Sequence, residues 1–429
     1  MRRAFPGVDA FAFRADKLGF MVRAARRGGV VELKLGGTPT YLLTEPADIR
    51  HVLVTEEPRF PKNPRLSNVA EPALFGEGLV AAAEADHRAM RRSLQPAFDQ
   101  RRLAGFGEII AATVDDVFST REVVELTPAT FALAHQVRRR VLLGRQGDDV
   151  GEELDAALQA RQRYINQAFV SPLPFPDRLP TRARRAYRRA QRDLERLLLP
   201  LVRSHDRGDT LLGHLRRLQL GEQRVFDEAR GFLASYELSA RALAWALLLV
   251  SERPDVQERL RSDGDAMGFP QLVYSEALRL YPPTWLFVRI APETAALPSG
   301  ATIRAGARLL LCPYATHRDP RHFPDPERFE PNRPRPRAAY FPFGGGRHVC
   351  VGEGFVRFEA ALVLARLAAG FDLEPAGNGA IVPFPGATLE LRGDARLRLR
   401  RRTPSGPFVS IPPRTATEGA SCRLPRVSS

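Results

Sequence analysis

Cysteine is scarce in this chain. Its 429 residues include three cysteines, Cys312, Cys350 and Cys422, which are too few for a disulfide framework. This scarcity fits a protein of the reducing cytoplasm. The sequence contains no CxxC pair, so it does not support zinc or iron–sulfur sites, which need several ligands close together.

Long apolar runs are also missing. The longest apolar region, Ala244 to Val250, is far shorter than the ~20 residues that cross a bilayer, so we expect a buried core helix and no membrane span. The N-terminal segment MRRAFPGVDAFAF contains basic residues but neither a sustained apolar core nor a small-residue cleavage site. We therefore expect no signal peptide and a cytoplasmic location.

Lysine is almost absent. The formal net charge is +15, yet Lys17, Lys34 and Lys62 are the only lysines, so nearly all of the positive charge comes from arginine. The arginines occur in small groups among acidic residues, without the basic stripe interleaved with aromatic residues that would suggest nucleic-acid binding. We interpret them as a solvated surface and expect no nucleic-acid partner.

The patterns that are present predict a mainly α protein with a smaller β portion. Residues 30–44 alternate apolar and polar side chains around two glycines, which is typical of a β-hairpin. Helical periodicity dominates residues 84–260. Beyond Pro282 we expect short strands and an irregular, proline-rich meander, with one further helix after Cys350.

The chain shows no internal repeat, and we expect residues 1–402 to form one domain. Residues 403–429 are rich in Ser, Thr, Pro and Gly, which predicts a disordered basic tail. Cys422 falls in this tail and is expected to have no role. Cys312 lies in the apolar run ARLLLCPY, so we expect it to be buried and inert.

Cys350 stands in a more specialised setting, the segment FPFGGGRHVCVGEGF at residues 341–355. Gly344, Gly345 and Gly346 lack a Cβ, so this backbone can bulge and approach a flat partner closely. An amphipathic helix is predicted just after Cys350, and its positive end would favour a thiolate. A haem iron needs only one protein thiolate, with the opposite face left open.

The ten residues FGGGRHVCVG resemble the haem-binding signature of cytochrome P-450 enzymes, in which a phenylalanine, spaced glycines, a basic residue and the cysteine recur in fixed order. The matching positions here are Phe343, Gly346, His348, Cys350 and Gly352. The resemblance runs from about residue 18 to residue 402. It implies the cytochrome P-450 fold as a single haem-enclosing domain, and heme b with the Cys350 thiolate as the axial ligand of the metal.

Two further segments are similar to the family. Glu276 and Arg279 lie three residues apart in EALR, where they can pair on one helix face. The segment HRDPRHFPDPERFEPNR resembles the family's meander, and its Arg328 is the expected third member of a buried polar network. This resemblance implies a structural role for all three residues, in support of the haem-side scaffold.

The resemblance also implies partners for the two haem propionates. His87 and Arg91, four residues apart in HRAMRRSLQPAF, match a His-x-x-x-Arg pair of the family. Arg289 in LFVRIAPE and His348 match its other propionate-binding positions.

The central helix departs from the family pattern Ala-Gly-x-acid-Thr. The sequence reads ASYELS at residues 234–239, so Glu237 keeps the acidic position while Leu238 replaces the threonine that helps to bring protons to bound dioxygen. Ser239 is no simple substitute, because one residue along a helix turns the side chain by about 100°. Three outcomes stay open: water or a substrate hydroxyl carries the protons, the helix shifts so that Ser235 or Ser239 serves, or the reaction is weakened or altered.

The implied activity is a monooxygenase that inserts one atom of O2 into a lipophilic small molecule, by hydroxylation or epoxidation. A secondary metabolite fits best, such as a terpenoid, polyketide or fatty-acid-like intermediate. The expected pocket includes the loop between residues 64 and 80 and the side chains of Phe232, Ala234, Leu238, Trp285, Leu286 and Val288.

Because no electron-carrying domain remains in the chain, electrons would come from NAD(P)H through a separate ferredoxin and ferredoxin reductase. Candidate docking residues for an acidic ferredoxin are Arg91, Arg92, Arg101, Arg102 and Arg357. We expect the enzyme to be a monomer.

Two alternatives remain open. Leu238 suggests a peroxide-using or non-oxidative haem-thiolate enzyme, such as an isomerase or dehydratase. The other is a non-catalytic protein, either a haem-binding or partner-recruiting relative or a basic nucleic-acid binder.

Overall fold

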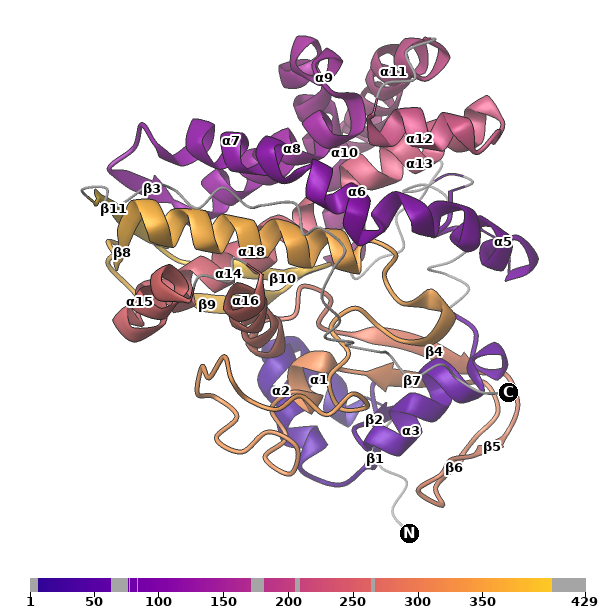
Figure 1. Ribbon diagram of the computed structural model, residues 1–429. Coiled ribbons are helices and arrows are strands. Elements are labelled where there is room, and N and C mark those ends of the chain that lie inside the picture. Colours follow the sequence, from indigo (N-terminus) through magenta and orange to yellow (C-terminus); the bar gives the residue numbers. More distant parts are fainter. Residues whose placement is uncertain are drawn as a thin grey trace, which may run out of the picture.

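The computed structural model describes residues 7–62, 76, 78–82, 84–170, 181–204, 209–263 and 267–402. Within these residues helices predominate and strands are short, which confirms the predicted mainly α class (Figure 1). The predicted tail at 403–429, Cys422 and most of the loop at 64–80 lie outside the described residues.

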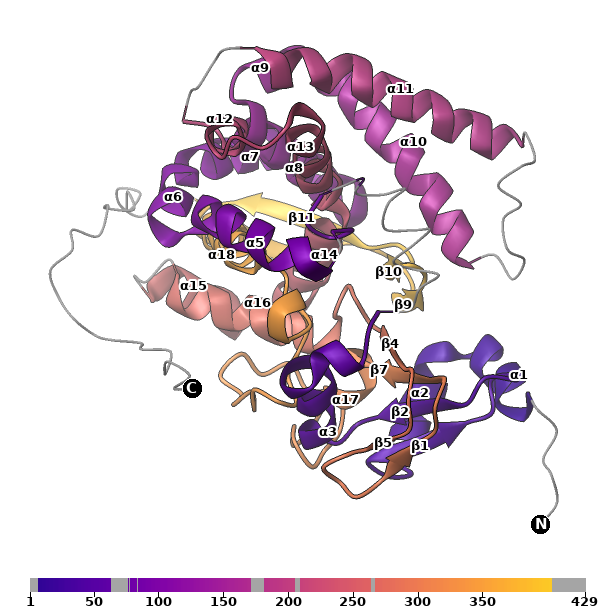
Figure 2. The same cartoon turned by 90° about the vertical axis from the view of Figure 1, so that its right-hand side faces the viewer.

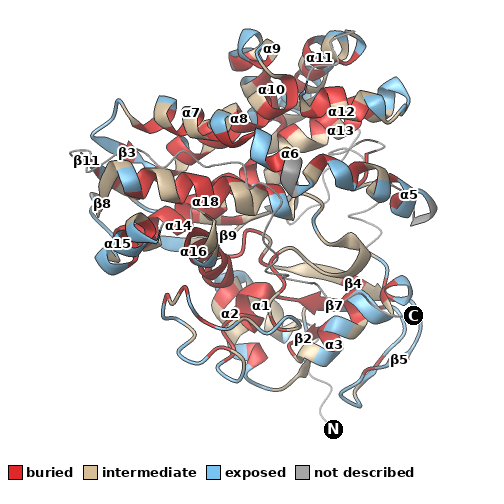
Figure 3. Ribbon diagram, in the orientation of Figure 1, coloured by how far each residue is buried: buried red, intermediate tan, exposed pale blue. Residues whose placement is uncertain are grey.

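The larger part of the molecule is a helical bundle whose core surrounds α14 (Figure 3). Its helices are α5 (Glu84–Leu94), α6 (Gln100–Gly105), α7 (Gly107–Phe118), α8 (Leu126–Leu143), α9 (Gln146–Asp149), α10 (Gly151–Val170), α11 (Arg182–Arg203), α12 (Leu211–Arg217), α13 (Glu222–Ala234), α14 (Tyr236–Ser251), α15 (Pro254–Ser262), α16 (Gly268–Leu280) and α18 (Glu353–Gly370). The helix predicted after Cys350 is therefore confirmed as α18, but its predicted amphipathic character is wrong, because six consecutive residues from Glu359 to Leu364 are buried on all sides of the helix.

A β-rich part lies below the bundle in the views of Figures 1 and 2. Its sheet has the order β1-β2-β7-β4, formed by β1 (Val30–Leu33), β2 (Thr40–Leu43), β7 (Ala307–Leu311) and β4 (Phe287–Ala291). Antiparallel pairing of Leu33 with Thr40 closes the predicted hairpin. Around the sheet are α1 (Val8–Ala15), α2 (Lys17–Ala25), α3 (Pro46–Arg50) and α17 (Pro313–Thr316).

Shorter elements complete the fold. The three-stranded sheet β3-β11-β8 joins β3 (Val123–Glu125), β11 (Arg396–Arg401) and β8 (Phe371–Pro375), and the hairpins are β5 (Ala295–Ala296) with β6 (Thr302–Ile303) and β9 (Val382–Pro385) with β10 (Leu389–Arg392). Single turns of tighter or wider helix are η1 (His51–Thr55), η2 (Glu57–Arg59), η4 (Gln95–Phe98) and η5 (Gly346–His348).

Local sequence explains where two important helices end. α16 stops at Leu280 because Tyr281 precedes Pro282, and a residue before proline is disfavoured in the α conformation. α13 and α14 follow one another and are interrupted at Ser235, whose hydroxyl donates to the Phe232 carbonyl at 2.7 Å. Such back-bonding by serine often bends a helix.

The segment from Glu222 to Ser251, which spans α13 and α14, is long and apolar enough to cross a membrane when length and composition alone are considered. However, 72% of its most apolar window is buried inside the protein. It therefore behaves as a core helix of the bundle, as predicted for Ala244 to Val250.

Candidate active site

The loop before Cys350 depends on glycine at two positions. Gly344 and Gly346 have φ angles of 78° and 64°, which side chains rarely adopt. A Cβ on Gly346 would also collide with the carbonyl oxygen of Leu53 in η1. The N–H of Cys350 donates to the carbonyl of Phe343 at 3.0 Å, so the loop folds back on itself and presses against η1.

The Cys350 sulfur lies in a recess. The residue is exposed, yet burial by the surrounding protein atoms raises the pKa of its thiol. The N–H of Gly352 opposes this effect, Glu353 adds to it, and the positive charges of Arg91 and Arg138 lower the pKa again. Burial therefore outweighs these groups, and the prediction that the helix end favours the ionised form does not hold for the free thiol. The Gly352 N–H, Arg91 and Arg138 are the groups that would stabilise a thiolate once a ligand is bound.

Cys312 behaves differently, as predicted. It is fully buried and its sulfur donates to the carbonyl of Trp285 at 3.2 Å. Burial raises the pKa of this thiol to about 12, so it stays protonated and inert.

A single cysteine such as Cys350 can serve a porphyrin iron but not a metal centre with several protein ligands. In the part of the chain that the structure describes, no three His, Cys, Asp or Glu side chains come together as a metal site. A centre built from several protein ligands is thus unsupported there, whereas a porphyrin iron takes one protein thiolate. A glycine-built recess around one accessible sulfur fits that flat group.

Cationic side chains from separate elements meet beside the Cys350 loop. The imidazole rings of His87 in α5 and His348 in η5 lie 4.3 Å apart between centroids. Arg91 of the same α5 helix donates to the carbonyl of Val349. Arg289, buried in β4, is near enough to the same group to act on the carboxylate of Glu57. The four predicted propionate ligands are therefore brought together, and they would hold the carboxylates of a bound haem.

Glu57 in η2 is an acidic member of this group that sequence reasoning missed. Its Oε1 lies 3.0 Å from Nε2 of His348, and its Oε2 lies 2.5 Å from Nε of Arg347. Burial alone would raise the pKa of this carboxyl, but the hydrogen bond from His348 and the charges of His348, Arg347 and Arg289 lower it overall. Glu57 therefore stays ionised and orients the loop cations.

On α14, Leu238 occupies the open position and the serines do not. Leu238 is 40% exposed, whereas Glu237 and Ser239 on either side of it are each 2% exposed. Ser239 donates to the Tyr236 carbonyl at 3.0 Å and accepts from Nη2 of Arg138 at 2.9 Å. In this conformation Ser239 therefore does not serve the open face, and the alternative in which a shifted helix lets Ser235 or Ser239 serve the reaction stays a prediction.

Ser235 is committed in the same way. Its hydroxyl donates to the Phe232 carbonyl and accepts from Nε of Arg138 at 3.3 Å. Because both serine hydroxyls already donate to carbonyls of their own helix, neither has a proton free for the open face.

Three side chains hold the carboxylate of Glu237. Its Oε1 accepts from Nη2 of Arg241 at 2.7 Å, from Asn166 of α10 at 3.2 Å and from Thr388, before β10, at 3.1 Å. Its Oε2 has no hydrogen-bond partner among the described residues. The acidic group that the family pattern retains is thus buried and fixed through one oxygen.

The buried network around Glu276 exists, but its predicted third member was wrong. Nη2 of Arg279 donates to Oε1 of Glu276 at 2.9 Å, and both side chains are fully buried. The other arginine at this oxygen is Arg333, with Nε at 3.1 Å. Arg328 instead points to solvent, where its side chain is 65% exposed and lies 3.8 Å from Glu330.

Arg328 contributes only its carbonyl oxygen, which accepts from Arg279 and Arg333. The segment following Pro331 also supplies Arg335, 3.5 Å from Oε2 of Glu276. Several arginines occur close together in this stretch, and their spacing alone did not indicate which side chain turns inward.

The expected pocket residues do not share one environment. Ala234 is half-buried one residue from the helix interruption. Phe232 packs against Phe98 and Phe355, with ring centroids 6.3 and 5.6 Å away, and so joins the bundle core. Trp285 is buried and donates to the carbonyl of Gly386 at 3.0 Å.

Leu286 and Val288 are half-buried and pack on the same apolar cluster as Trp285. Of the six side chains named as lining residues, Leu238 is thus the one that is exposed.

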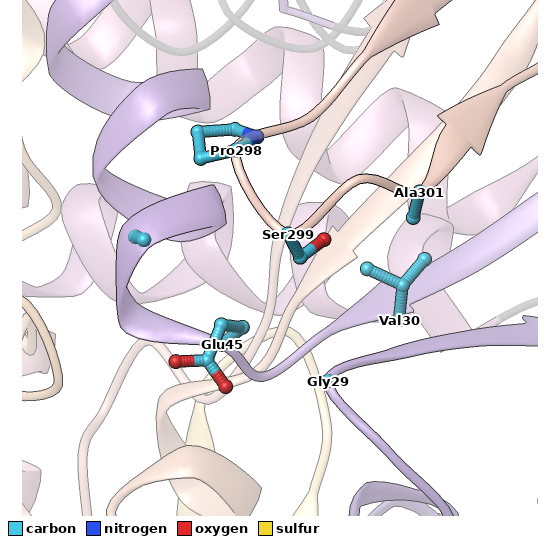
Figure 4. Close-up of a pocket in the computed structure, with 7 residues that line it drawn as sticks. Gly29, Val30, Glu45, Pro298, Ser299 and Ala301 are labelled. Atoms are coloured by element: carbon cyan, nitrogen blue, oxygen red, sulfur yellow. The ribbon is translucent and has the colours of Figure 1, made fainter.

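A shallow groove at the edge of the four-stranded sheet is a separate feature (Figure 4). Its lining consists of Gly29, Val30, Glu45, Ala47, Pro298, Ser299 and Ala301. None of these residues belongs to the Cys350 loop, to α14 or to the cationic group, so this groove is not the active site.

Comparison with known proteins identifies the family. The sequence profile of the cytochrome P450 family matches residues 14–209 and 229–391. The chain is 30% identical over 410 residues to cyclooctatin synthase of Streptomyces melanosporofaciens, covering 87% of this chain and 89% of that protein. It is 31% identical over 417 residues to cyclooctat-9-en-7-ol 5-monooxygenase of the same organism, covering 87% and 86%.

Solved structures give the same result. CYP175A1 from Thermus thermophilus superimposes with a TM-score of 0.76 at 28% identity, over 94% of this chain and 99% of that one. Since the family profile covers most of the chain and relatives at 30% identity or more align over most of its length, this chain belongs to the cytochrome P450 family of haem-thiolate monooxygenases.

Proposed function

We propose that the enzyme oxidises a lipophilic terpenoid, either a hydrocarbon or an alcohol derived from one. The exposed side chain on α14 is the apolar Leu238. An apolar side chain at this open position favours apolar substrates. The name of one relative, cyclooctat-9-en-7-ol 5-monooxygenase, specifies an unsaturated alcohol as its substrate.

The assignment depends most on Cys350, whose sulfur would bind the haem iron, while His87, Arg91, Arg289 and His348 would hold the propionates. When bound, haem would supply the oxygen chemistry, in which O2, two electrons and two protons convert the substrate into its oxidised form and water. The protein's part is to fix the sulfur, hold Glu237 in place, and present an apolar wall to the substrate.

Two absorbance measurements test this proposal. The reduced, CO-bound holoprotein is expected to show the strongly red-shifted Soret band of a thiolate complex. A panel of terpene hydrocarbons and alcohols, polyketides and fatty acids is then screened for loss of the water ligand of the oxidised iron. If only fatty acids or polyketides produce this change, the enzyme still belongs to the family but the terpenoid assignment is wrong.

Electrons would come from NAD(P)H through an external ferredoxin and ferredoxin reductase in the cytoplasm. Arg92 is exposed on α5, the helix that also carries Arg91, and would suit an acidic carrier. Arg357 drops out of the candidate docking face, because it donates to Ser275 at 2.7 Å and stacks over the Phe343 ring. If the turnover rate with an acidic ferredoxin did not depend on ionic strength, this docking would be refuted.

Leu238 favours a second candidate function, a peroxide-using or non-oxidative haem-thiolate enzyme. It presents no hydroxyl at the position where the family places its threonine. Product formation with hydrogen peroxide alone is compared with formation from electrons and O2. A higher rate with peroxide would favour this alternative.

A further inference from the structure

A fully buried arginine behind α14 links the two walls of the active site. Arg138 of α8 is 1% exposed, and its Nη1 donates to Oε1 of Glu359 at 2.9 Å. Glu359 is fully buried in α18, the helix that begins just after Cys350. The same guanidinium also donates to Ser239, through Nη2 at 2.9 Å, and to Ser235, through Nε at 3.3 Å.

The three donor atoms of this side chain thus reach two helices at once. Ser235 lies at the interruption between α13 and α14, three residues before the exposed Leu238. The guanidinium carbon also lies 4.5 Å from the ring centroid of Phe355, on the first turn of α18. One planar group therefore sets the position of the α14 junction relative to the helix that follows the thiolate loop.

Burying the charges of Arg138 and Glu359 costs free energy, which suggests that the pair does more than stabilise the fold. Removing two charges from water is expensive, and buried ion pairs are often no more stabilising than apolar replacements of the same size. Glu359 moreover leaves its Oε2 without a hydrogen-bond partner among the described residues. A planar fork with donors in fixed directions is, however, well suited to holding several partners in a fixed geometry.

We propose that Arg138 is a positioning residue for the monooxygenase reaction, which holds the α13–α14 junction in register with the Cys350-bearing segment. It does not touch the reacting atoms and acts through Ser235, Ser239 and Glu359. The proposal rests on the haem-thiolate function given above and adds a residue that sets the spacing between the thiolate side and the open side of the site.

Arg139 provides a matched control. It is the next residue of α8, is 8% exposed, and forms its own ion pair with Asp155 at 2.7 Å. Asp155 belongs to α10, so this pair does not connect α14 to α18. Arg138→Met and Arg139→Met each remove one largely buried guanidinium from the same helix, but only the first removes the link between the walls.

The test uses haem-loaded full-length protein and two probes. CO on the reduced protein reports the thiolate side, and the Kd for imidazole, which binds iron from the open face, reports the other side. For Arg138→Met we expect the thiolate-type share of the CO complex to fall about twofold or more and the imidazole Kd to change about threefold or more. Arg139→Met is expected to lower the unfolding midpoint while both readouts stay at the wild-type values.

The double variant Ser235→Ala, Ser239→Ala separates the two ends of the link. It keeps the Arg138–Glu359 pair, so the thiolate-type band is expected to persist while the imidazole Kd changes as in Arg138→Met. This variant also decides the matter if Arg138→Met does not fold. The proposal would be overturned if the imidazole Kd of the double variant equalled that of the wild type. It would also be overturned if Arg138→Met and Arg139→Met changed the CO complex and the imidazole Kd equally. Absence of a thiolate band in the wild type would instead refute the haem-thiolate function.

Discussion

Arg333 and Arg279 donate to the same oxygen of Glu276, Oε1, at 3.1 and 2.9 Å, and all three side chains are buried. Removing one partner from such a group leaves an uncompensated charge in the protein interior. We therefore expect Glu276→Gln and Arg333→Met each to lower the free energy of unfolding by about 3–5 kcal/mol. Denaturant titration of the holoprotein measures this change.

Arg328→Met is the matched control for that prediction. The Arg328 side chain is largely exposed and only its carbonyl serves the network, so its removal is expected to alter the free energy of unfolding by no more than about 0.5 kcal/mol. A loss as large as that of Arg333→Met would show that the side chain of Arg328 is needed after all.

Replacing Leu238 tests the missing hydroxyl directly. Leu238→Thr places a proton donor at the exposed position of α14, whereas Leu238→Val trims the side chain without adding one. We expect Leu238→Thr to raise the ratio of product to hydrogen peroxide roughly twofold to tenfold, which is less than a fully positioned acid supplies. Equal ratios in the two variants would mean that protons arrive by a route that does not pass residue 238.

Cys350→Ala is expected to abolish the red-shifted band of the reduced CO complex, because Cys350 is the accessible thiol beside the cationic group. Cys312→Ala removes a buried, protonated sulfur and is expected to keep that band while lowering the unfolding midpoint. Retention of the thiolate band in Cys350→Ala would contradict the site as described.

Glu228 predicts a pH dependence of stability. Burial raises the pKa of its carboxyl to about 7, against a hydrogen bond from the N–H of Leu79 that lowers it. The folded state therefore binds more protons than the unfolded state between the ordinary carboxyl pKa of about 4.3 and 7, so the free energy of unfolding falls as pH rises through this window.

Glu228→Gln removes this titration. The variant is expected to be more stable than wild type above pH 7, with a difference that shrinks toward pH 4.3. Thermal midpoints measured across this range provide the check, with the exposed Glu195→Gln as background. A constant difference at all pH values would exclude Glu228 as the titrating group.

Much of the site was predictable because it depends on local chemistry. The glycines before Cys350 and the helix after it lie within one short segment, and the hairpin at residues 30–44 is likewise a local pattern. The His87–Arg91 spacing on one helix face was also readable. These features need no knowledge of the tertiary fold.

The features that were missed depend on which side of an element faces inward. Three consecutive arginines follow Val137 and nothing in their order distinguishes Arg138, whose partners come from α14 and α18. The exchange of Arg328 for Arg333 has the same cause, because an irregular segment has no periodicity to indicate its buried face. The constraint on Ser235 and Ser239 was equally hidden, because the arginine that donates to both hydroxyls lies on α8.

The collision that a side chain on Gly346 would have with the Leu53 carbonyl has a consequence for engineering. The loop that presents the sulfur takes its shape from a turn supplied much earlier in the chain, and Glu57 beside that turn holds the loop's cations. A fragment without its first sixty residues would keep every residue of the haem-binding signature and still lack the surface against which it folds. Grafting the signature onto another scaffold would therefore require the segment that contains Leu53 and Glu57 as well.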